Sequence, residues 1–179
     1  MDERLEKTRA WVQSTVIGLG LCPFADKVSR SGRLRYEISE ATGVEDQLKA
    51  AVDSLISLSE ASREETETTL LVFPHASGEF PEFLDFVETV RNLARQLGLH
   101  GVIQTVPFHP GFHFKGTPPE LPENYTNRSP FPMLHLLREQ SISELPLTEE
   151  ELLQIPVRNA TRLRELGLKK ILETYRLNS

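Results

Sequence analysis

The chain has 179 residues, of which 39% are hydrophobic and 26% are charged, and this composition suits a single globular domain spanning residues 1–179. The formal net charge of −6 argues against sequence-independent binding to nucleic acid, which requires clustered Lys and Arg. No apolar run approaches the roughly 20 residues needed to cross a bilayer, so no membrane association is expected.

The start of the chain and its cysteine content bear on the compartment. MDERLEKTRAW contains no apolar core of a signal peptide. Cys22 is the single cysteine, which rules out an internal disulfide framework and fits a reducing environment. We therefore expect a cytoplasmic protein.

The first predicted elements are a helix, a strand and a second helix. Apolar residues recur at helical spacing over residues 2–19, and Cys22-Pro23 ends that helix. Residues 34–38, LRYEI, alternate in polarity as in a half-exposed strand. Thr42-x-x-Glu45 resembles a capping box at the start of the next helix, which is followed by a charged connector over residues 59–67.

The middle of the chain alternates between strand and helix. The apolar run TTLLVF at 68–73 is typical of a strand covered on both faces, and GVIQTVPF at 101–108 is a further strand. Between them, Pro81 begins a helix and Gly98 ends it. This order predicts an α/β protein with a small, mostly parallel sheet of three or four strands and helices packed on it. An α+β fold with an antiparallel split βαβ sheet is the alternative.

The last third of the chain is predicted to be helical. Ser129-Pro130 fits a helix start, with Ser129 as the N-cap. Thr148-E-E-Glu151 matches a capping box, and Gly167 separates two further helices. A fourth strand is placed near 112–114. The basic C-terminal stretch reads as a solvated helix face, with a partner surface as the alternative; its charges are Arg158, Arg162, Arg164, Lys169, Lys170 and Arg176.

Two histidines directly follow the predicted buried strands. His75 follows the strand at 68–73, and His109 follows the strand at 101–108. If these strands are parallel neighbours, both imidazoles face one crevice at the sheet edge where ligands usually bind. Without that arrangement, each is an ordinary loop histidine.

A metal site is the less favoured interpretation of the histidines. His109 and His113 are separated by Pro110-Gly111, which excludes the helix that brings i and i+4 ligands together. A third ligand could be Cys22 or His135, but no spacing specifies it. We therefore predict no metal ligands and leave the cofactor unspecified, noting that no glycine-rich phosphate loop or dinucleotide fingerprint occurs.

Cys22 lies near the end of the first predicted helix. The negative end of a helix dipole raises a thiol pKa, so activation would need His75, His109 or Arg128 close by. A buried, inert cysteine packed against Phe24 is the simpler interpretation.

The stretch NYTNRSPFPMLHLLRE at 124–139 holds an unusual density of polar groups. With a helix starting at Ser129, the side chains of Asn127 and Arg128 would stand beside exposed backbone N–H groups at the positive end of the helix dipole. That combination favours a small anion such as a phosphate or carboxylate. The alternative is a structural loop whose side chains satisfy backbone carbonyls.

Three motifs carry a resemblance to a known family. LCPFA at 21–25, FHP at 108–110 and the whole 124–139 stretch resemble the bacterial and plant family called domain of unknown function 1415, and ETTLLVFP at 67–74 fits it as well. The resemblance spans nearly the whole chain but implies no activity. Carried over position by position, it points to Cys22, His109, Asn127, Arg128, Ser129, His135 and Arg138.

These observations support two functional hypotheses. The first is an enzyme acting on a small anionic metabolite, with His109 as general acid or base and His75 or Cys22 assisting. The anion would be bound by residues of the polar stretch, namely Asn124, Asn127, Arg128, Ser129, His135 and Arg138. The second is a non-catalytic ligand-binding or adaptor protein that uses the same crevice. The oligomeric state is left open.

Overall fold

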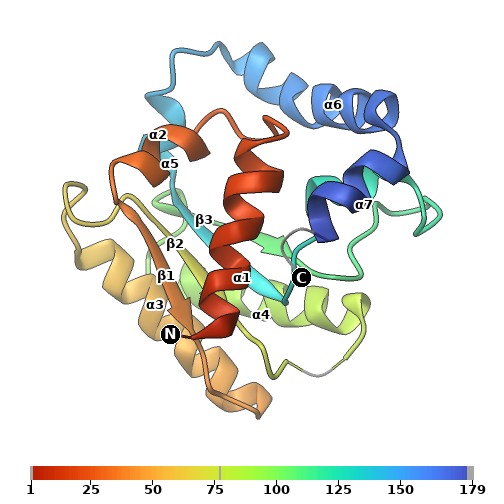
Figure 1. The fold of residues 1–179 in the computed structure, drawn as a ribbon. Coiled ribbons are helices and arrows are strands. Elements are labelled where there is room, and N and C mark those ends of the chain that lie inside the picture. The colour runs from red at the N-terminus through yellow and green to blue at the C-terminus, as the bar shows by residue number, and fades with distance from the viewer. Residues whose placement is uncertain (1, 77, 177–179) are drawn as a thin grey trace.

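The computed structural model describes residues 2–76 and 78–176, whose helices and strands are shown in Figure 1. In chain order they are α1 (Glu3–Trp11), the π-helix η1 (Val12–Ile17), α2 (Ala25–Arg30), β1 (Leu34–Ile38), α3 (Val44–Glu60), β2 (Thr68–Val72), α4 (Phe80–Gln96), β3 (Ile103–Phe108), the 3-10 helix η2 (Pro122–Thr126), β4 (Met133–Arg138), α5 (Glu139–Ser143), α6 (Glu149–Leu166) and α7 (Leu168–Arg176).

The four strands form one mixed sheet in the order β1-β2-β4-β3. β1 and β2 are parallel, whereas β4 is antiparallel to both β2 and β3. The predicted α/β class, with packed helices and a helical C-terminal third, is confirmed. Within that class, β2, α4 and β3 form the split βαβ unit named as the alternative, because β4 lies between the two strands.

Helices cover both faces of the sheet, so the molecule has three layers (Figure 1). Alternate residues of β2 point to opposite faces. Leu70 and Val72 pack with Trp11 and the π-helix on one face. Leu71 belongs to the core formed with α3 and α4 on the other face. Every residue of β2 is buried, which explains the run of Leu, Val and Phe without polar alternation in the sequence.

The structure of residues 129–139 differs from the helix predicted from the sequence. They do not begin a helix: Met133–Arg138 is β4, the strand inserted between β2 and β3. Leu134 and Leu136 pack on one face and Met133 packs on the other, so the strand lacks the alternation that would distinguish it from a helix. The segment near 112–114, predicted as a fourth strand, is a turn and loop. No helix N-terminus therefore exists at Ser129.

Helix boundaries follow the sequence in some places and depart from it in others. Thr148 and Glu151 form the expected capping box, and Pro81 lies in the first turn of α4. The helix after β1, however, begins at Val44 without a side-chain cap, so the expected box at Thr42 is wrong. The first helix ends at Trp11 and continues as a π-helix.

The C-terminal helices pack against the turn that follows the π-helix and against η2. Their shared cluster contains Leu21, Tyr125, Leu163 and Ile171, and partly buried neighbours include Tyr175. Of the basic residues in this part of the chain, Arg164 forms an ion pair with Glu123, at 2.8 Å. The packing brings α7 close to the end of α1, which is where the candidate site lies.

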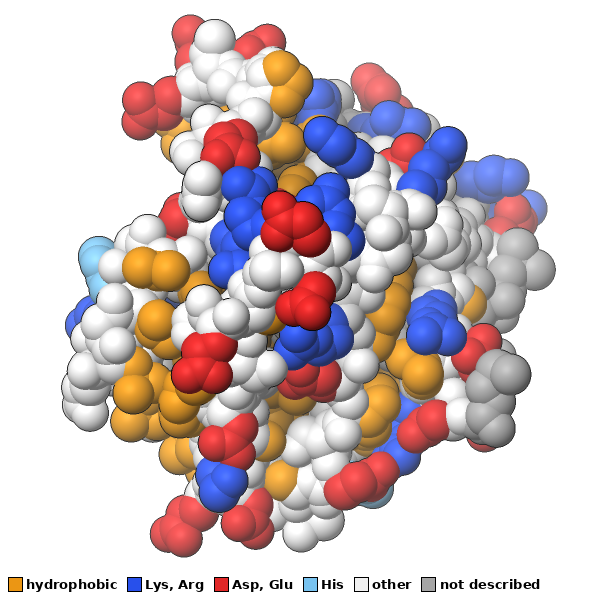
Figure 2. Space-filling view, turned by 90° about the vertical axis from the view of Figure 1, so that its left-hand side faces the viewer, with side chains coloured by type: hydrophobic (Ala, Val, Ile, Leu, Met, Phe, Trp, Pro, Cys, Tyr) orange, Lys and Arg blue, Asp and Glu red, His pale blue; other side chains and the backbone are white. Residues whose placement is uncertain are grey.

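The exposed edge of the sheet at β1 carries charges of both signs. Figure 2 looks onto the side of the molecule where α2, β1 and α3 lie, and Lys or Arg side chains are interspersed there with Asp and Glu. Arg35 and Glu37 of β1 form one such pair, at 3.3 Å. Charges on an edge strand discourage pairing with another chain. Among the described residues, no helix combines the length and apolar character required to span a membrane.

Candidate functional site

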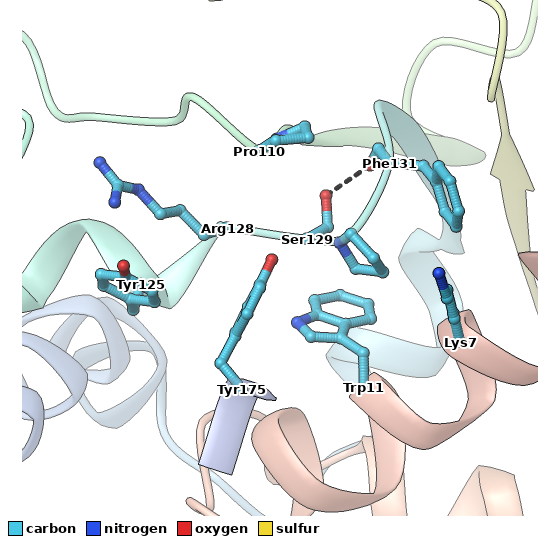
Figure 3. A pocket seen from close by; sticks show the side chains of 9 residues that line it. Lys7, Trp11, Pro110, Tyr125, Arg128, Ser129, Phe131 and Tyr175 are labelled. Atoms are coloured by element: carbon cyan, nitrogen blue, oxygen red, sulfur yellow. Dashed lines mark hydrogen bonds between the residues drawn. The ribbon is translucent and has the colours of Figure 1, made fainter. Parts of the chain in front are cut away.

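A pocket of about 280 Å³ opens where α1, α7 and the segments flanking β3 and β4 meet (Figure 3). Its described lining residues are Lys7, Trp11, Pro110, Tyr125, Arg128, Ser129, Pro130, Phe131 and Tyr175. Lys7 and Trp11 lie four residues apart and so share one face of α1. The lining contains basic and aromatic side chains but no acidic one, which distinguishes it from the acidic chain as a whole.

Trp11 supplies a hydrogen-bond donor that the protein does not use. Its side chain is only 2% exposed, yet Nε1 is buried without a hydrogen-bond partner among the described residues. Figure 3 shows this nitrogen on the edge of the indole nearest Tyr175. An unmade hydrogen bond of a buried donor costs about 1–3 kcal/mol. Neighbouring atoms cover this nitrogen in the structure, so a ligand acceptor would have to displace them to remove that cost.

Tyr175, which lies beside Trp11 in Figure 3, adds a second donor. Its hydroxyl points into the pocket in Figure 3, and its ring packs edge-on against Tyr125 at 5.7 Å. Burial raises the pKa of Tyr175, so the phenol stays protonated at neutral pH. Lys7 contributes an ammonium group that pairs with the exposed Glu3 at 3.1 Å. Such a surface pair is weak and leaves Lys7 available.

Arg128 lines the pocket and also forms hydrogen bonds to the loop that precedes it. Its Nε donates to the carbonyl of Phe112 at 3.0 Å, and Nη2 donates to the carbonyl of Pro119. The guanidinium lies 4.6 Å from the ring centroid of Tyr125, within the range of a cation–π interaction. Among the described residues no acceptor is found for Nη1, so part of the fork remains for a ligand.

The asparagines of the polar stretch stabilise the loop at 109–121. The Asn124 side chain is fully buried: its Oδ1 accepts from the N–H of Phe114, and its Nδ2 donates to the carbonyl of Pro118. Asn127 Nδ2 donates to the carbonyl of Pro107 at 3.2 Å. Ser129, also buried, donates from Oγ to the carbonyl of Phe131 at 2.6 Å. These contacts are the ones expected from the alternative interpretation, in which the polar stretch is a structural loop whose side chains satisfy backbone groups.

His109 lies beside the pocket rather than in its wall. It is 7% exposed, and its ring packs 5.3 Å from Phe83 and 5.5 Å from Phe80, measured between centroids. Its Nδ1 accepts from the N–H of Gly111 at 3.0 Å. Burial lowers the pKa of His109, which keeps the imidazole neutral. The adjacent Pro110, not the imidazole, lines the pocket.

His75 belongs to another part of the surface. Its Nε2 lies 3.1 Å from Glu40 Oε2, which also receives a hydrogen bond from Arg4. β4 separates the strands that precede His75 and His109, so these strands are about 10 Å apart rather than neighbours. The expectation that both imidazoles face one crevice is therefore not met.

Arg138, at the end of β4, stabilises the opposite layer. It is 9% exposed, and its Nη2 donates at 2.7 Å to the carbonyls of Leu58 and Ala61 and at 3.1 Å to that of Thr66. Two of these carbonyls lie at the C-terminal end of α3, where backbone acceptors lack helical partners. Arg138 thus caps α3 and faces away from the pocket.

Cys22 and His135 meet at a separate small cavity on the far side of Trp11. Burial raises the pKa of the Cys22 thiol and lowers the pKa of His135 to about 4, so both groups are neutral near pH 7. Over residues 2–76 and 78–176, no three His, Cys, Asp or Glu side chains converge in a way that could bind a metal ion.

Comparison with known proteins identifies the family. The family described as Protein of unknown function (DUF1415) matches residues 3–173. The chain belongs to this family. No curated protein and no solved structure matches it. The match covers almost the whole chain, which agrees with the resemblance to DUF1415 seen in the sequence motifs.

The pocket of this DUF1415 protein contains residues that sequence reasoning missed. Of the residues singled out from the sequence, Arg128 and Ser129 line it, whereas Lys7, Trp11 and Tyr175 were not predicted as site residues. The i, i+4 pairing of a lysine and the single tryptophan was a usable signal. Nothing in the sequence around Tyr175 indicated that α7 would pack beside α1.

Proposed function

We propose that this DUF1415 protein binds a small anion with a planar or apolar body, in the pocket between Lys7 and Arg128. The observation that carries the proposal is the presence of two basic side chains, Lys7 and Arg128, in a pocket whose described lining residues include no acidic one. The side chains of Lys7, Arg128 and Tyr175 can donate to a ligand, and two of them carry positive charge. An acceptor with negative charge, such as a carboxylate or phosphate, complements this set.

The apolar part of the lining suggests the rest of the ligand. Pro110, Pro130 and Phe131 surround the donors, and the indole of Trp11 offers a flat wall. Ligand sites are mostly apolar with a few convergent polar groups, and the volume of about 280 Å³ lies near the lower end of their usual range. A single aromatic or short branched acid is of suitable size.

The lining favours binding over catalysis. General acid–base catalysis needs a group that exchanges a proton near neutral pH, most often His, Asp or Glu. No His, Asp or Glu is present among the described lining residues, and Nδ1 of His109 accepts from the N–H of Gly111. We therefore place the ligand-binding hypothesis ahead of the enzyme hypothesis, in which His109 acts as general acid or base.

Intrinsic fluorescence offers a direct test, because Trp11 is the only tryptophan. Benzoate and phenylphosphate would be titrated against the neutral analogues benzamide and benzyl alcohol. We expect only the anions to change the emission saturably. Lys7→Met should weaken binding about tenfold or more, as expected for a lost charged hydrogen bond, whereas Lys49→Met, in an exposed ion pair on α3, should not.

Trp11→Phe tests the proposed donor by calorimetry, since the fluorophore is removed. It keeps an aromatic ring beside Phe108 and deletes the N–H, so anion binding should weaken while the fold persists. Equal binding by Lys7→Met and Lys49→Met, or no anion binding at all, would exclude the proposed site. Turnover of a bound anion that is lost in His109→Gln, with binding retained, would instead support the enzyme hypothesis.

A further inference from the structure

A second cavity, of about 60 Å³, lies between the π-helix and the sheet. Its walls come from Trp11, Val16, Phe24, Leu70 and Phe108, among other apolar residues. Outside the helical wall, three lining side chains carry a polar or sulfur atom. They are those of Cys22, Thr68 and His135. A π-helix is a rare distortion that often occurs at functional sites, and here it forms one side of the cavity.

The hydrogen bonds around His135 fix which ring nitrogen carries the proton. Thr68 Oγ1 donates its only hydrogen to the carbonyl of Leu136, at 2.5 Å. The same Oγ1 lies 2.8 Å from His135 Nε2 and must therefore accept there, so Nε2 is the protonated nitrogen. The neutral ring, favoured by burial, then has a lone pair on Nδ1.

That lone pair has no donor among the residues that the structure describes. No hydrogen bond to His135 Nδ1 is found among them, and His135 is one of the residues that line the cavity. Water is a poor occupant of this space, because a buried water normally makes about three hydrogen bonds. Thr68 has already used its hydrogen, and the rest of the lining is largely apolar.

We propose that this cavity is a binding site for a small uncharged molecule that has one hydroxyl group on an apolar skeleton, with His135 Nδ1 accepting the hydroxyl hydrogen. An anion is excluded, because the imidazole is neutral and the cavity contains no cation among its described residues. The site is distinct from the anion pocket: Trp11 is the wall that the two share.

The size of the cavity limits the ligand. An apolar cavity of about 150 Å³ accommodates benzene, so one of about 60 Å³ suits a short-chain alcohol or the end of a longer one. Propan-2-ol and acetone form a matched pair of probes, because they share a carbon skeleton and only the alcohol donates a hydrogen bond.

Nuclear magnetic resonance of protein with labelled histidine tests the site without any substitution. We expect the Nδ1 resonance of His135 to have the shift of an unprotonated nitrogen and to move on addition of propan-2-ol. Propan-2-ol should bind about three- to tenfold more tightly than acetone, which corresponds to one neutral hydrogen bond. A protonated Nδ1, or equal binding of the two probes, would overturn the proposal.

The thiol of Cys22 provides a second measurement, because it is the only cysteine and lines the same cavity. Propan-2-ol should slow its reaction with a thiol reagent, and acetone should slow it less. Val16→Leu, which adds volume to the cavity wall while leaving His135 in place, should abolish the protection. His100→Phe, at an exposed histidine before β3, should leave it unchanged. Protection that persists in Val16→Leu would show that the alcohol binds elsewhere.

Discussion

The two halves of the polar stretch use similar residues in opposite ways. In residues 124–129 the side chains organise a loop, and Arg128 remains partly available to a ligand. In residues 133–138 the polar groups lie on a covered strand, where Arg138 is satisfied by backbone carbonyls of α3. A run of hydrogen-bonding residues therefore indicates buried backbone that must be satisfied as readily as it indicates a ligand site.

The largest effect is expected at Arg138, a buried cation that donates to several backbone carbonyls. Arg138→Met leaves the carbonyls of Leu58, Ala61 and Thr66 without their donor, and it should lower the free energy of unfolding by about 3–5 kcal/mol. Urea denaturation measures the loss. Arg30→Met, at an 81% exposed side chain, is the control and should change stability by no more than about 0.5 kcal/mol. Similar values for both variants would contradict the capping role of Arg138.

In the loop half, Asn124 should matter most. Asn124→Ala removes the acceptor for the Phe114 N–H and the donors to Pro118 and Pro119, so stability should fall by about 2–4 kcal/mol. Hydrogen exchange should accelerate first in residues 109–121. Exchange that rises evenly over the whole chain would show that Asn124 does not act through this loop.

His135 makes the strand half sensitive to acid. Burial lowers its pKa to about 4 from the ordinary 6.5, so the folded state binds its proton less readily than the unfolded state. The stabilisation is complete above pH 6.5 and is lost as the pH falls toward 4. By pH 5 the wild type should have lost about 2 kcal/mol through this group. His135→Leu should show a correspondingly flatter pH dependence in urea denaturation.

The smallest effect is expected at Asn127. Asn127→Ala removes one hydrogen bond to the carbonyl of Pro107, at 3.2 Å, and should cost about 1 kcal/mol. Thermal denaturation would resolve this difference from the larger loss in Asn124→Ala. If the Asn127 variant were the less stable of the two, Asn127 rather than Asn124 would contribute more to the stability of the loop.

Much of the fold could be predicted from local signals. The buried strand at TTLLVF, Pro81 at the start of α4 and the capping box at Thr148 each depend on neighbouring residues alone. β4 could not be predicted in the same way. With both faces covered, MLHLLR has no period-two alternation, and Ser129-Pro130 before it imitates a helix start.

The candidate site was predictable only in part, because it depends on contacts between distant segments. Arg128 stood out through its polar neighbours, whereas Trp11 and Tyr175 come together only when α7 packs beside α1. The expectation that His75 and His109 face one crevice was not met for a similar reason. The strands that precede them, β2 and β3, run in the same direction, as predicted. However, β4, which comes later in the chain, lies between them.

The central position of β4 has a consequence for synthesis on the ribosome. A nascent chain that has not yet released residues 133–138 holds β2 and β3 without the strand that joins them, so each offers an open backbone edge. Pairing across such sequence distances is slow and exposes partly assembled chains to aggregation. The segment that completes the sheet is translated after every other strand, and truncation before residue 133 should yield chains that depend on chaperones.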